Sequence, residues 1–138
     1  MSDPSLALQK AIRAQLVASP SLTALVPAAN VFDRSTRPEK FPCIIIGDGQ
    51  TVLTGDDYCR RRVRVYADLH VWTKEDGLAQ AKAIAGAISD AIRGASAWAI
   101  EDHHCADLYA SGSRFLRDPA GQNGHAVVTV ESLLERAL

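Results

Sequence analysis

The chain has 138 residues, of which 47% are hydrophobic and 22% charged, a composition typical of one globular domain. Its 15 basic and 16 acidic side chains give a formal charge of -1, which excludes a general polyanion binder because phosphate affinity needs a surplus of Lys and Arg. We therefore expect a single domain over residues 1–138, with one core.

The sequence carries no sign of export or membrane insertion. No basic region followed by an apolar run stands near Met1, and no stretch reaches the roughly 18 apolar residues that cross a bilayer. Three cysteines at unrelated spacings indicate reduced thiols rather than a disulfide framework. We expect a soluble protein that stays in the compartment where it is made.

The first predicted element is a helix that begins at Pro4. A capping carboxylate on Asp3, followed by a proline at the first helical position, is a typical helix start. Apolar residues then recur every three or four positions, so the helix extends to about Ala18 and places one apolar stripe against the rest of the protein. Ser21 is expected to cap one further short turn of helix.

A polar loop over residues 30–41 is predicted next, too poor in apolar side chains to be packed and therefore mobile. Its basic residues are Arg34, Arg37 and Lys40. The β-branched run FPCIIIGDG follows, and its uninterrupted apolar residues predict a short strand, buried on both faces, that ends at Gly47.

After a turn at Gly55, the segment RVRVYADLHVW alternates strictly and predicts a long strand. Its odd-numbered positions are all apolar and belong in a core. Its even-numbered positions carry charge, hydrogen-bonding groups or large rings, too many for ordinary solvent-facing surface, so we expect this face to contact a partner. The residues of that face are Arg62, Arg64, Tyr66, Asp68, His70 and Trp72.

The second main helix is predicted to follow this strand. Thr73 is the expected N-cap, and Asp76, three residues on, is expected to return the hydrogen bond as in a capping box. Isoleucine and alanine at helical spacing continue to Gly94, which we expect to end the helix in a left-handed conformation.

The remainder of the chain is β in character. AWAIEDHHCADLYASGSRFLRD predicts one long strand that bends near Ser111 and Gly112, and HAVVTVESLLE predicts the returning strand of a hairpin. The order helix, strand, strand, helix, strand, strand indicates an α+β fold, a mostly antiparallel sheet with two main helices packed on one face. The opposite face of such a sheet is left available to a partner.

No pattern in the sequence indicates a catalytic residue, a cofactor or a metal site. The motifs of nucleophilic, phosphate-binding and metallopeptidase sites are absent. EDHHCADL contains residue types that bind metals, but neighbours in a strand point to opposite faces, so His103 and Cys105 would share one side and Asp102 and His104 the other. A site would need further ligands from elsewhere, and we expect neither a metal nor an enzyme.

The run CRRRVR is the best candidate for nucleic-acid binding. Arg60, Arg62 and Arg64 would alternate onto one face of the strand, with Arg61 on the other. Arginines on a sheet bind phosphates or, as readily, carboxylates of another subunit. The balanced overall charge favours the subunit contact, and a small nucleic-acid-binding module that uses Arg60 to Arg64 is the alternative.

Three motifs are the most specific in the chain: Phe41–Pro42 before an aliphatic strand, LHVW before a helix, and RDPAG before GHAVV. With the order of elements up to Glu135, they resemble the tail terminator, or tail completion, proteins of long-tailed phages and gene transfer agents. The resemblance implies a structural protein that forms a ring, usually of six subunits, on the finished end of the tail tube. Such a ring halts tube polymerisation and presents the surface to which the head connector docks.

The resemblance also implies the partners: other copies of the chain, the major tail tube protein, the head connector or stopper protein, and DNA that passes through the lumen without sequence-specific binding, with no membrane involved. The protein would be present in the bacterial cytoplasm during assembly and then in the tail of the particle. The expected subunit interface comprises Arg62, Arg64, Tyr66, His70 and Trp72, and the expected docking loops for tube or connector contain Arg34, Arg37, Lys40, Arg117 and Asp118.

Overall fold

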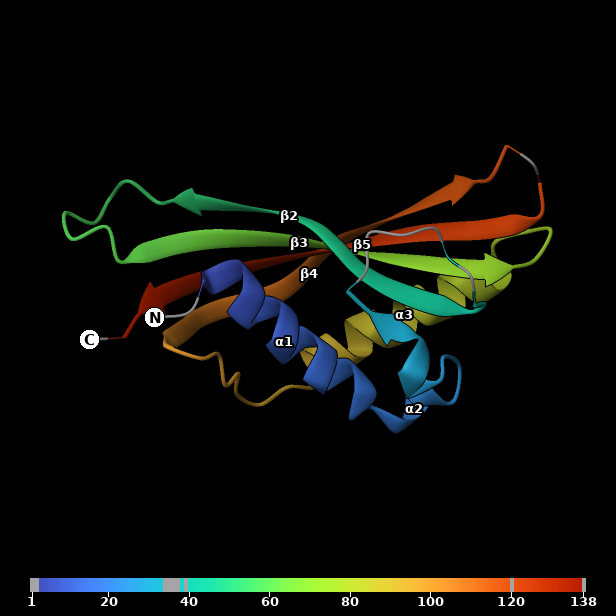
Figure 1. Cartoon of the computed structure of the whole chain (residues 1–138), viewed down its shortest axis with the longest axis horizontal. Helices are drawn as coiled ribbons and strands as arrows, with labels where there is room; N and C mark the ends of the chain where they lie inside the picture. The colour runs from blue at the N-terminus through green and yellow to red at the C-terminus, as the bar shows by residue number, and fades with distance from the viewer. Residues whose placement is uncertain (1–2, 34–37, 39, 120, 138) are drawn as a thin grey trace.

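The computed structural model describes residues 3–33, 38, 40–119 and 121–137. Five strands form one mixed sheet in an α+β fold, and the helices lie on one side of it (Figure 1). In chain order the elements are α1 (Pro4–Val17), α2 (Pro20–Thr23), the 3-10 helix η1 (Ala28–Asn30), β1 (Val31–Phe32), β2 (Cys43–Leu53), β3 (Arg62–Lys74), α3 (Ala79–Arg93), β4 (His103–Arg117) and β5 (Asn123–Arg136).

The strands lie in the order β1-β2-β3-β5-β4. β2, β3, β5 and β4 pair antiparallel, but β1 pairs parallel with β2, with Val31 opposite Ile44. The sheet is therefore mixed, and the expectation of a mostly antiparallel sheet is corrected. β1 was not predicted because two residues show no periodicity, and Val31 was expected in an unpacked loop although this side chain is buried.

β3 is the central strand of the sheet. The odd-numbered residues from Val63 to Val71 are buried, while the even-numbered residues of β3 are half-buried or exposed, as the alternation predicts. β3 pairs along its length with β2 on one edge and β5 on the other. The backbone of β3 is thus hydrogen-bonded between two neighbouring strands. The position of β3 therefore determines the register of both β2 and β5.

β2 is longer than the sequence predicted. It continues past Gly47 to Leu53 through a bulge between Ile46 and Gly49. At position 49 a Cβ would lie 2.6 Å from the carbonyl oxygen of Tyr66, so the close approach of the two strands requires glycine. Gly47, where the strand was predicted to end, instead lies in the bulge inside β2.

α1 contacts β2 and β3, whereas α3 contacts β4 and β5, so the two long helices lie against the same side of the sheet (Figure 1). Gln15 Nε2 donates a hydrogen bond of 2.9 Å to the carbonyl of Ala91 and joins the two helices. Each large apolar side chain buried in this layer stabilises the fold by about 1.5–3 kcal/mol. The buried residues that the helices supply include Leu8, Ile12, Leu16, Ile84 and Ile88.

The predicted start of α1 is confirmed, and the predicted start of α2 is corrected. Asp3 caps α1, since its carboxylate accepts a 3.0 Å bond from the N–H of Leu6. α2 begins two residues earlier than expected, with Ser19 rather than Ser21 at the N-cap position. No helix in the described part of the chain is both long enough and apolar enough to cross a bilayer.

The start of α3 is organised by Glu75. Its carboxylate accepts hydrogen bonds from the N–H groups of Gln80 (3.0 Å) and Ala81 (2.9 Å) and from the hydroxyl of Thr73. Burial raises the pKa of the Glu75 carboxyl, but these hydrogen bonds outweigh burial and hold the pKa below its usual value. Gly124 on β5 leaves room for the group, because a Cβ there would collide with the Thr73 hydroxyl.

The predicted capping box of Thr73 and Asp76 is therefore wrong. Thr73 is a buried residue inside β3, and α3 starts only at Ala79, so the acceptor for its first N–H groups comes from the connecting turn. The helix ends at Gly94 as expected, but Gly94 has a φ of -74° and is right-handed.

Replacing Glu75 with Gln should destabilise the protein by about 1 kcal/mol near pH 7, because a neutral amide accepts helix N–H groups more weakly than a carboxylate. The folded-state pKa of Glu75 is below its unfolded-state pKa. Its contribution is therefore present above the unfolded-state pKa and is lost as the pH falls through the folded-state pKa. Urea unfolding of both proteins at about pH 7 and about pH 3.5 measures this, and the difference between them should shrink at the lower pH.

Asp76→Asn, at the exposed neighbouring position, is the matched control and should change the free energy of unfolding by less than about 0.5 kcal/mol. A Glu75→Gln effect of the same size at both pH values would contradict the capping role.

Candidate assembly surface

The face of the sheet opposite α1 and α3, here called the open face, carries the five residues predicted to form a subunit interface. Arg62, Arg64, Tyr66, His70 and Trp72 occupy alternate positions of β3, and no helix among the described residues covers them. Arg64 is exposed and the other four are half-buried. β3 therefore presents a mixed aromatic and charged surface on this side.

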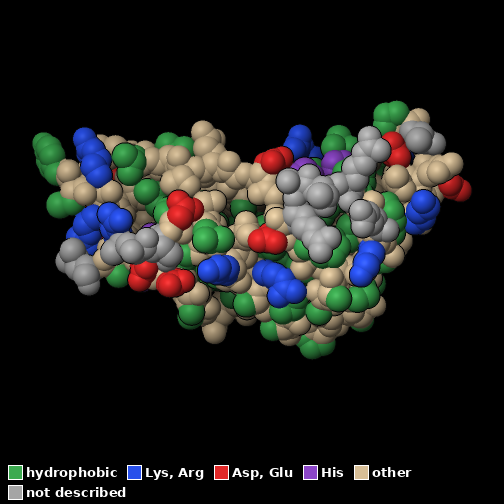
Figure 2. Space-filling view, viewed as in Figure 1, with side chains coloured by type: hydrophobic (Ala, Val, Ile, Leu, Met, Phe, Trp, Pro, Cys, Tyr) green, Lys and Arg blue, Asp and Glu red, His purple; other side chains and the backbone are tan. Residues whose placement is uncertain are grey.

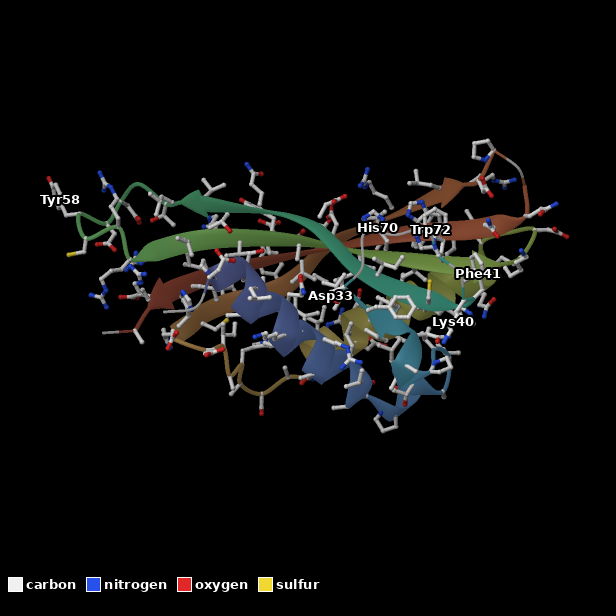
Figure 3. The ribbon with its side chains drawn as sticks, viewed as in Figure 1. Asp33, Lys40, Phe41, Tyr58, His70 and Trp72 are labelled. Atoms are coloured by element: carbon white, nitrogen blue, oxygen red, sulfur yellow. The ribbon has the colours of Figure 1, made fainter. Side chains whose placement is uncertain are left out.

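Trp72, His125 and His70 form one stack on the open face. Figure 3 shows His70 and Trp72 near each other on β3. The rings of Trp72 and His125 lie within 6° of parallel, with centroids 3.8 Å apart. His125 Nε2 is 3.0 Å from His70 Nδ1, and Asp48 Oδ2 is 3.8 Å from His70 Nε2. The contact with Asp48 is too long for a hydrogen bond, and which ring donates in the bond between His70 and His125 depends on their tautomers. The alternation of β3 predicted His70 and Trp72 on this face, but no pattern in the sequence indicated His125 and Asp48 as their partners.

Three apolar side chains next to the stack are buried, although the helices lie on the other side of the sheet. Val127 is 1% exposed and Ile45 is 7% exposed, and both pair with His70 across their strands. Cys43, opposite Trp72, is fully buried. Burial raises the pKa of the Cys43 thiol to about 11, against the smaller effect of a hydrogen bond with the backbone of Trp72. The stack and these residues form a small apolar cluster of their own.

His125 is held in its neutral form. Burial is the largest cause of its lowered pKa, followed by the nearby His70 and Arg114. A hydrogen bond between two imidazoles needs one ring nitrogen as donor and another as acceptor, so at least one ring must be neutral. The hydrogen bond between His70 and His125 thus fits a neutral His125.

A shallow depression of about 330 Å³ lies beside the stack, at the bulge of β2. Thr129 Oγ1 donates a 2.8 Å hydrogen bond to Asp68 on its wall. Two carboxylates around a tyrosine ring suit a cationic side chain better than a phosphate. The lining residues are Asp48, Gly49, Gln50, Tyr66, Asp68 and Thr129.

The far end of the open face is basic, but its arginines have partners in the same molecule. Arg62 Nη1 is 3.5 Å from Asp56 Oδ2, and Arg61 Nη2 is 3.3 Å from Glu135 Oε1. These surface pairs contribute little to stability, yet they lower the local surplus of positive charge. The run CRRRVR is therefore not an unbroken strip of free cations.

Arg60 does not belong to β3. It lies in the preceding turn with a φ of 54°, and its Nη1 donates a 2.7 Å bond to the carbonyl of Asp57. The prediction that Arg60 alternates with Arg62 and Arg64 on one strand face is wrong, because the strand begins at Arg62. Two arginines rather than three share that face.

The predicted docking loop before β2 is described only in part, since Arg34 and Arg37 lie outside the described residues. Lys40 is exposed, near the end of the sheet where Trp72 lies (Figure 3). The ammonium group of Lys74 lies over the ring of the neighbouring residue Phe41, 5.2 Å from the ring centroid. Phe41 therefore ties this loop to the end of β3.

The second predicted docking loop joins β4 to β5. Arg117 is the last residue of β4 and is exposed. The carboxylate of Asp118 accepts a 3.1 Å bond from Asn123 Nδ2, and its carbonyl accepts a 2.8 Å bond from Gly121 N–H. Asp118 thus stabilises the turn, and Arg117 is the better placed of the two to contact another protein.

The histidine-rich start of β4 does not assemble a ligand set. His103 Nδ1 is 2.7 Å from the carbonyl of Glu101, and Cys105 Sγ donates a 3.4 Å bond to the carbonyl of Asp107. Among the described residues, no three His, Cys, Asp or Glu side chains come together as metal ligands.

A model of the family described as tail completion protein gp17 matches residues 10–135. A chain from the virion of a native gene transfer agent particle has a TM-score of 0.80 at 23% identity, with 98% of this chain and 99% of that chain covered. The gp17 protein of bacteriophage SPP1 has a TM-score of 0.58 at 22% identity, with 93% and 88% covered. At these identities the structural likeness shows the fold alone. No curated protein matches the sequence.

Acidification should destabilise the protein through His125. Its folded-state pKa lies below the unfolded-state value of about 6.5. The stability that its neutral form contributes is complete above that value and is lost as the pH falls through the folded-state pKa. His125→Phe keeps a flat ring against Trp72 and removes the titration. Chemical unfolding at about pH 7.5 and about pH 5.5 should show a smaller loss of stability for the variant than for the wild type.

His104→Gln, at an exposed position of β4, is the control and should lose as much stability as the wild type over this range. Equal losses in His125→Phe and the wild type would rule out the stack as the source of the pH dependence.

Proposed function

The chain belongs to the tail completion protein gp17 family, and from this premise we propose that it forms a ring at the head-proximal end of a phage or phage-like tail tube. Members of this family are structural components of the virion, and the protein is not an enzyme. In the proposal, six copies close the ring, end polymerisation of the tube protein and join the tail to the head connector.

The observation that most supports a ring is the one-sided cover of the sheet. The helices shield one face, while the open face mixes aromatic and charged side chains. A closed ring needs a head-to-tail contact between two different patches of the same chain. Arg64 lies toward one end of the open face, and Asp48 and Asp68 line a depression elsewhere on it, so opposite charges occupy different positions as such a contact requires.

Tyr66, His70 and Trp72 are suited to the centre of one patch. Aromatic side chains and arginine are enriched where protein interfaces bury surface. All three are half-buried in the single chain, so each still has surface to lose on contact with a neighbour. Arg64 beside them would then pair with a carboxylate of the next copy.

The loops at the end of the sheet near Trp72 are assigned to axial contacts. Lys40 is exposed in the segment before β2 and Arg117 is exposed at the end of β4. In the proposal one of them contacts the tail tube and the other the head connector. DNA would pass through the lumen without specific binding, which fits a formal charge of -1 because a strongly basic wall would retain phosphates. The protein would enter the particle's tail after synthesis in the bacterial cytoplasm.

The nucleic-acid-binding alternative has less support. It requires a free basic strand at Arg60 to Arg64, but Arg61 and Arg62 face carboxylates of the same molecule and Arg60 lies in a turn. A duplex would meet the carboxylates Asp56 and Glu135 at the same place, which weakens phosphate contacts.

Deletion of the gene should give tails of uncontrolled length without heads, because no ring ends the tube. Complementation with the wild-type gene should restore particles, whereas Tyr66→Asp should reduce complete particles more than about tenfold, because it places an unpaired charge in the proposed interface. Electron microscopy of tail lengths and counts of headed particles measure both effects.

Ala83→Asp introduces the same charge on the exposed side of α3 and should complement as well as the wild type. Tails of normal length that carry heads in the deletion strain would contradict the proposed function.

A further inference from the structure

β2 and β3 continue past the helices at one end of the molecule and form a projecting hairpin, residues 51–62, here called the hairpin arm (Figure 1). Val52 is 40% exposed, Leu53 is 51% exposed and Tyr58 is 100% exposed. Tyr58 marks the tip in Figure 3, and Figure 2 shows hydrophobic and basic side chains together at this end. Apolar side chains grouped on a projection are typical of a contact surface.

The tip of the arm is held in one conformation. The carboxylate of Asp57 accepts hydrogen bonds from the N–H groups of Cys59 (3.0 Å) and Arg61 (2.8 Å), and Arg60 Nη1 donates to the Asp57 carbonyl at 2.7 Å. The bonds from Arg61 and Cys59 also lower the pKa of the Asp57 carboxyl. Tyr58 lies between these hydrogen-bonded residues, so the backbone that carries it is positioned before any contact forms, which reduces the entropy lost on binding.

The charged groups of the arm already interact with one another. Thr54 donates its hydroxyl hydrogen to Asp56, and Asp56 also faces Arg62 at 3.5 Å. What the arm offers to a partner is therefore mainly its apolar side chains. Such a projection fits an apolar pocket with a polar rim better than a strongly charged surface.

A pocket of about 300 Å³ with this character opens at the other edge of the sheet, between the end of α3 and β4. The buried Ile92 and the half-buried Trp98 and Leu108 supply its apolar lining, and Ser89 and Arg93 supply polar groups. An aromatic ring suits these groups: apolar carbon lies against its faces, a guanidinium stacks on it, and a hydroxyl meets the phenol.

The arm cannot reach the pocket of its own molecule. Val52 pairs with Arg64 and Leu53 with Val63, so the stem of the arm is fixed as a strand pair on the β2 side of the sheet. The pocket lies under β4, and β5 separates β4 from β3. An arm on one edge and a receptor on the other edge is the arrangement that links identical copies head to tail.

We propose that the hairpin arm docks into this pocket of a second copy of the chain, with Tyr58 as its anchor. The inference rests on the proposed ring and names the contact that would link successive subunits in it. The charges on the two sides are compatible, since Arg61 and Arg62 of the arm lie against carboxylates and Arg93 at the pocket is 3.2 Å from Asp90.

Photo-crosslinking in assembled particles tests the contact directly. Full-length protein that carries p-benzoylphenylalanine in place of Tyr58 is incorporated into tails and irradiated. The expected product is a covalent dimer whose link maps to residues 89–98 or 108–110 of the second copy. The same reagent at Leu25, an exposed apolar position outside the arm and the pocket, should give no dimer.

The outcomes separate this inference from the proposed function. A link from position 58 to another tail protein, a dimer linked at a different segment, or no link at all would overturn the docking while the ring proposal stands. Tails that contain none of the protein would overturn both.

Substitutions on the two sides give the second measurement. Tyr58→Ser should reduce complete particles about 30-fold, as expected for the loss of an aromatic anchor, and Ser89→Trp, which fills the pocket, should do the same. Leu25→Ser should change the yield less than about threefold. Thermal unfolding should be unchanged for Tyr58→Ser, because its side chain is wholly exposed. Full assembly with Tyr58→Ser would refute the anchor.

Discussion

The register of β3 determines the rest of this structure. Every other side chain of the strand is packed under the helices, and the strand is hydrogen-bonded to β2 and to β5. A shift of one residue would place Val65 and Leu69 in solvent and Arg64 in the core, at a cost of several kcal/mol for the buried charge alone. Because the apolar face fixes the register, it also determines which side chains reach the open face. The side chains that the open face displays are thus a consequence of the core.

The two ends of the sheet are built differently. Near Trp72 the open face is covered by stacked rings that lie beside the buried Val127. At the other end the strands extend past the helices, and Tyr58 is exposed. One end is a packed surface and the other a projection. A virion protein that associates with other tail or head proteins needs surfaces for contact. A long sheet covered on one face can provide more than one of them within 138 residues.

Much of the fold could be predicted because α1, α3, β3 and β5 each bury one periodic face. Prediction failed where tertiary contacts decide the structure. Glu75 rather than Thr73 caps α3, since the chain must turn out of β3 before the helix can start. His125 meets Trp72 through the pairing of β3 with β5, which no local pattern specifies. Arg60 leaves the strand alternation because a turn with positive φ precedes β3. The alternation of β3 predicted which residues of this strand lie on the face of the candidate site. It did not predict which residues of other strands, such as His125, contact them.

The three thiols lie in environments that differ enough to be told apart chemically. Burial raises the pKa of Cys43 to about 11 and also raises that of the half-buried Cys105, whereas Cys59 is exposed, one residue after Tyr58. The thiolate is the form that reacts with electrophiles, so a maleimide at neutral pH alkylates Cys59 first. A fluorophore attached in this way marks the hairpin arm of the unaltered sequence. Energy transfer from it would report the approach of a neighbouring molecule while a tail is being finished.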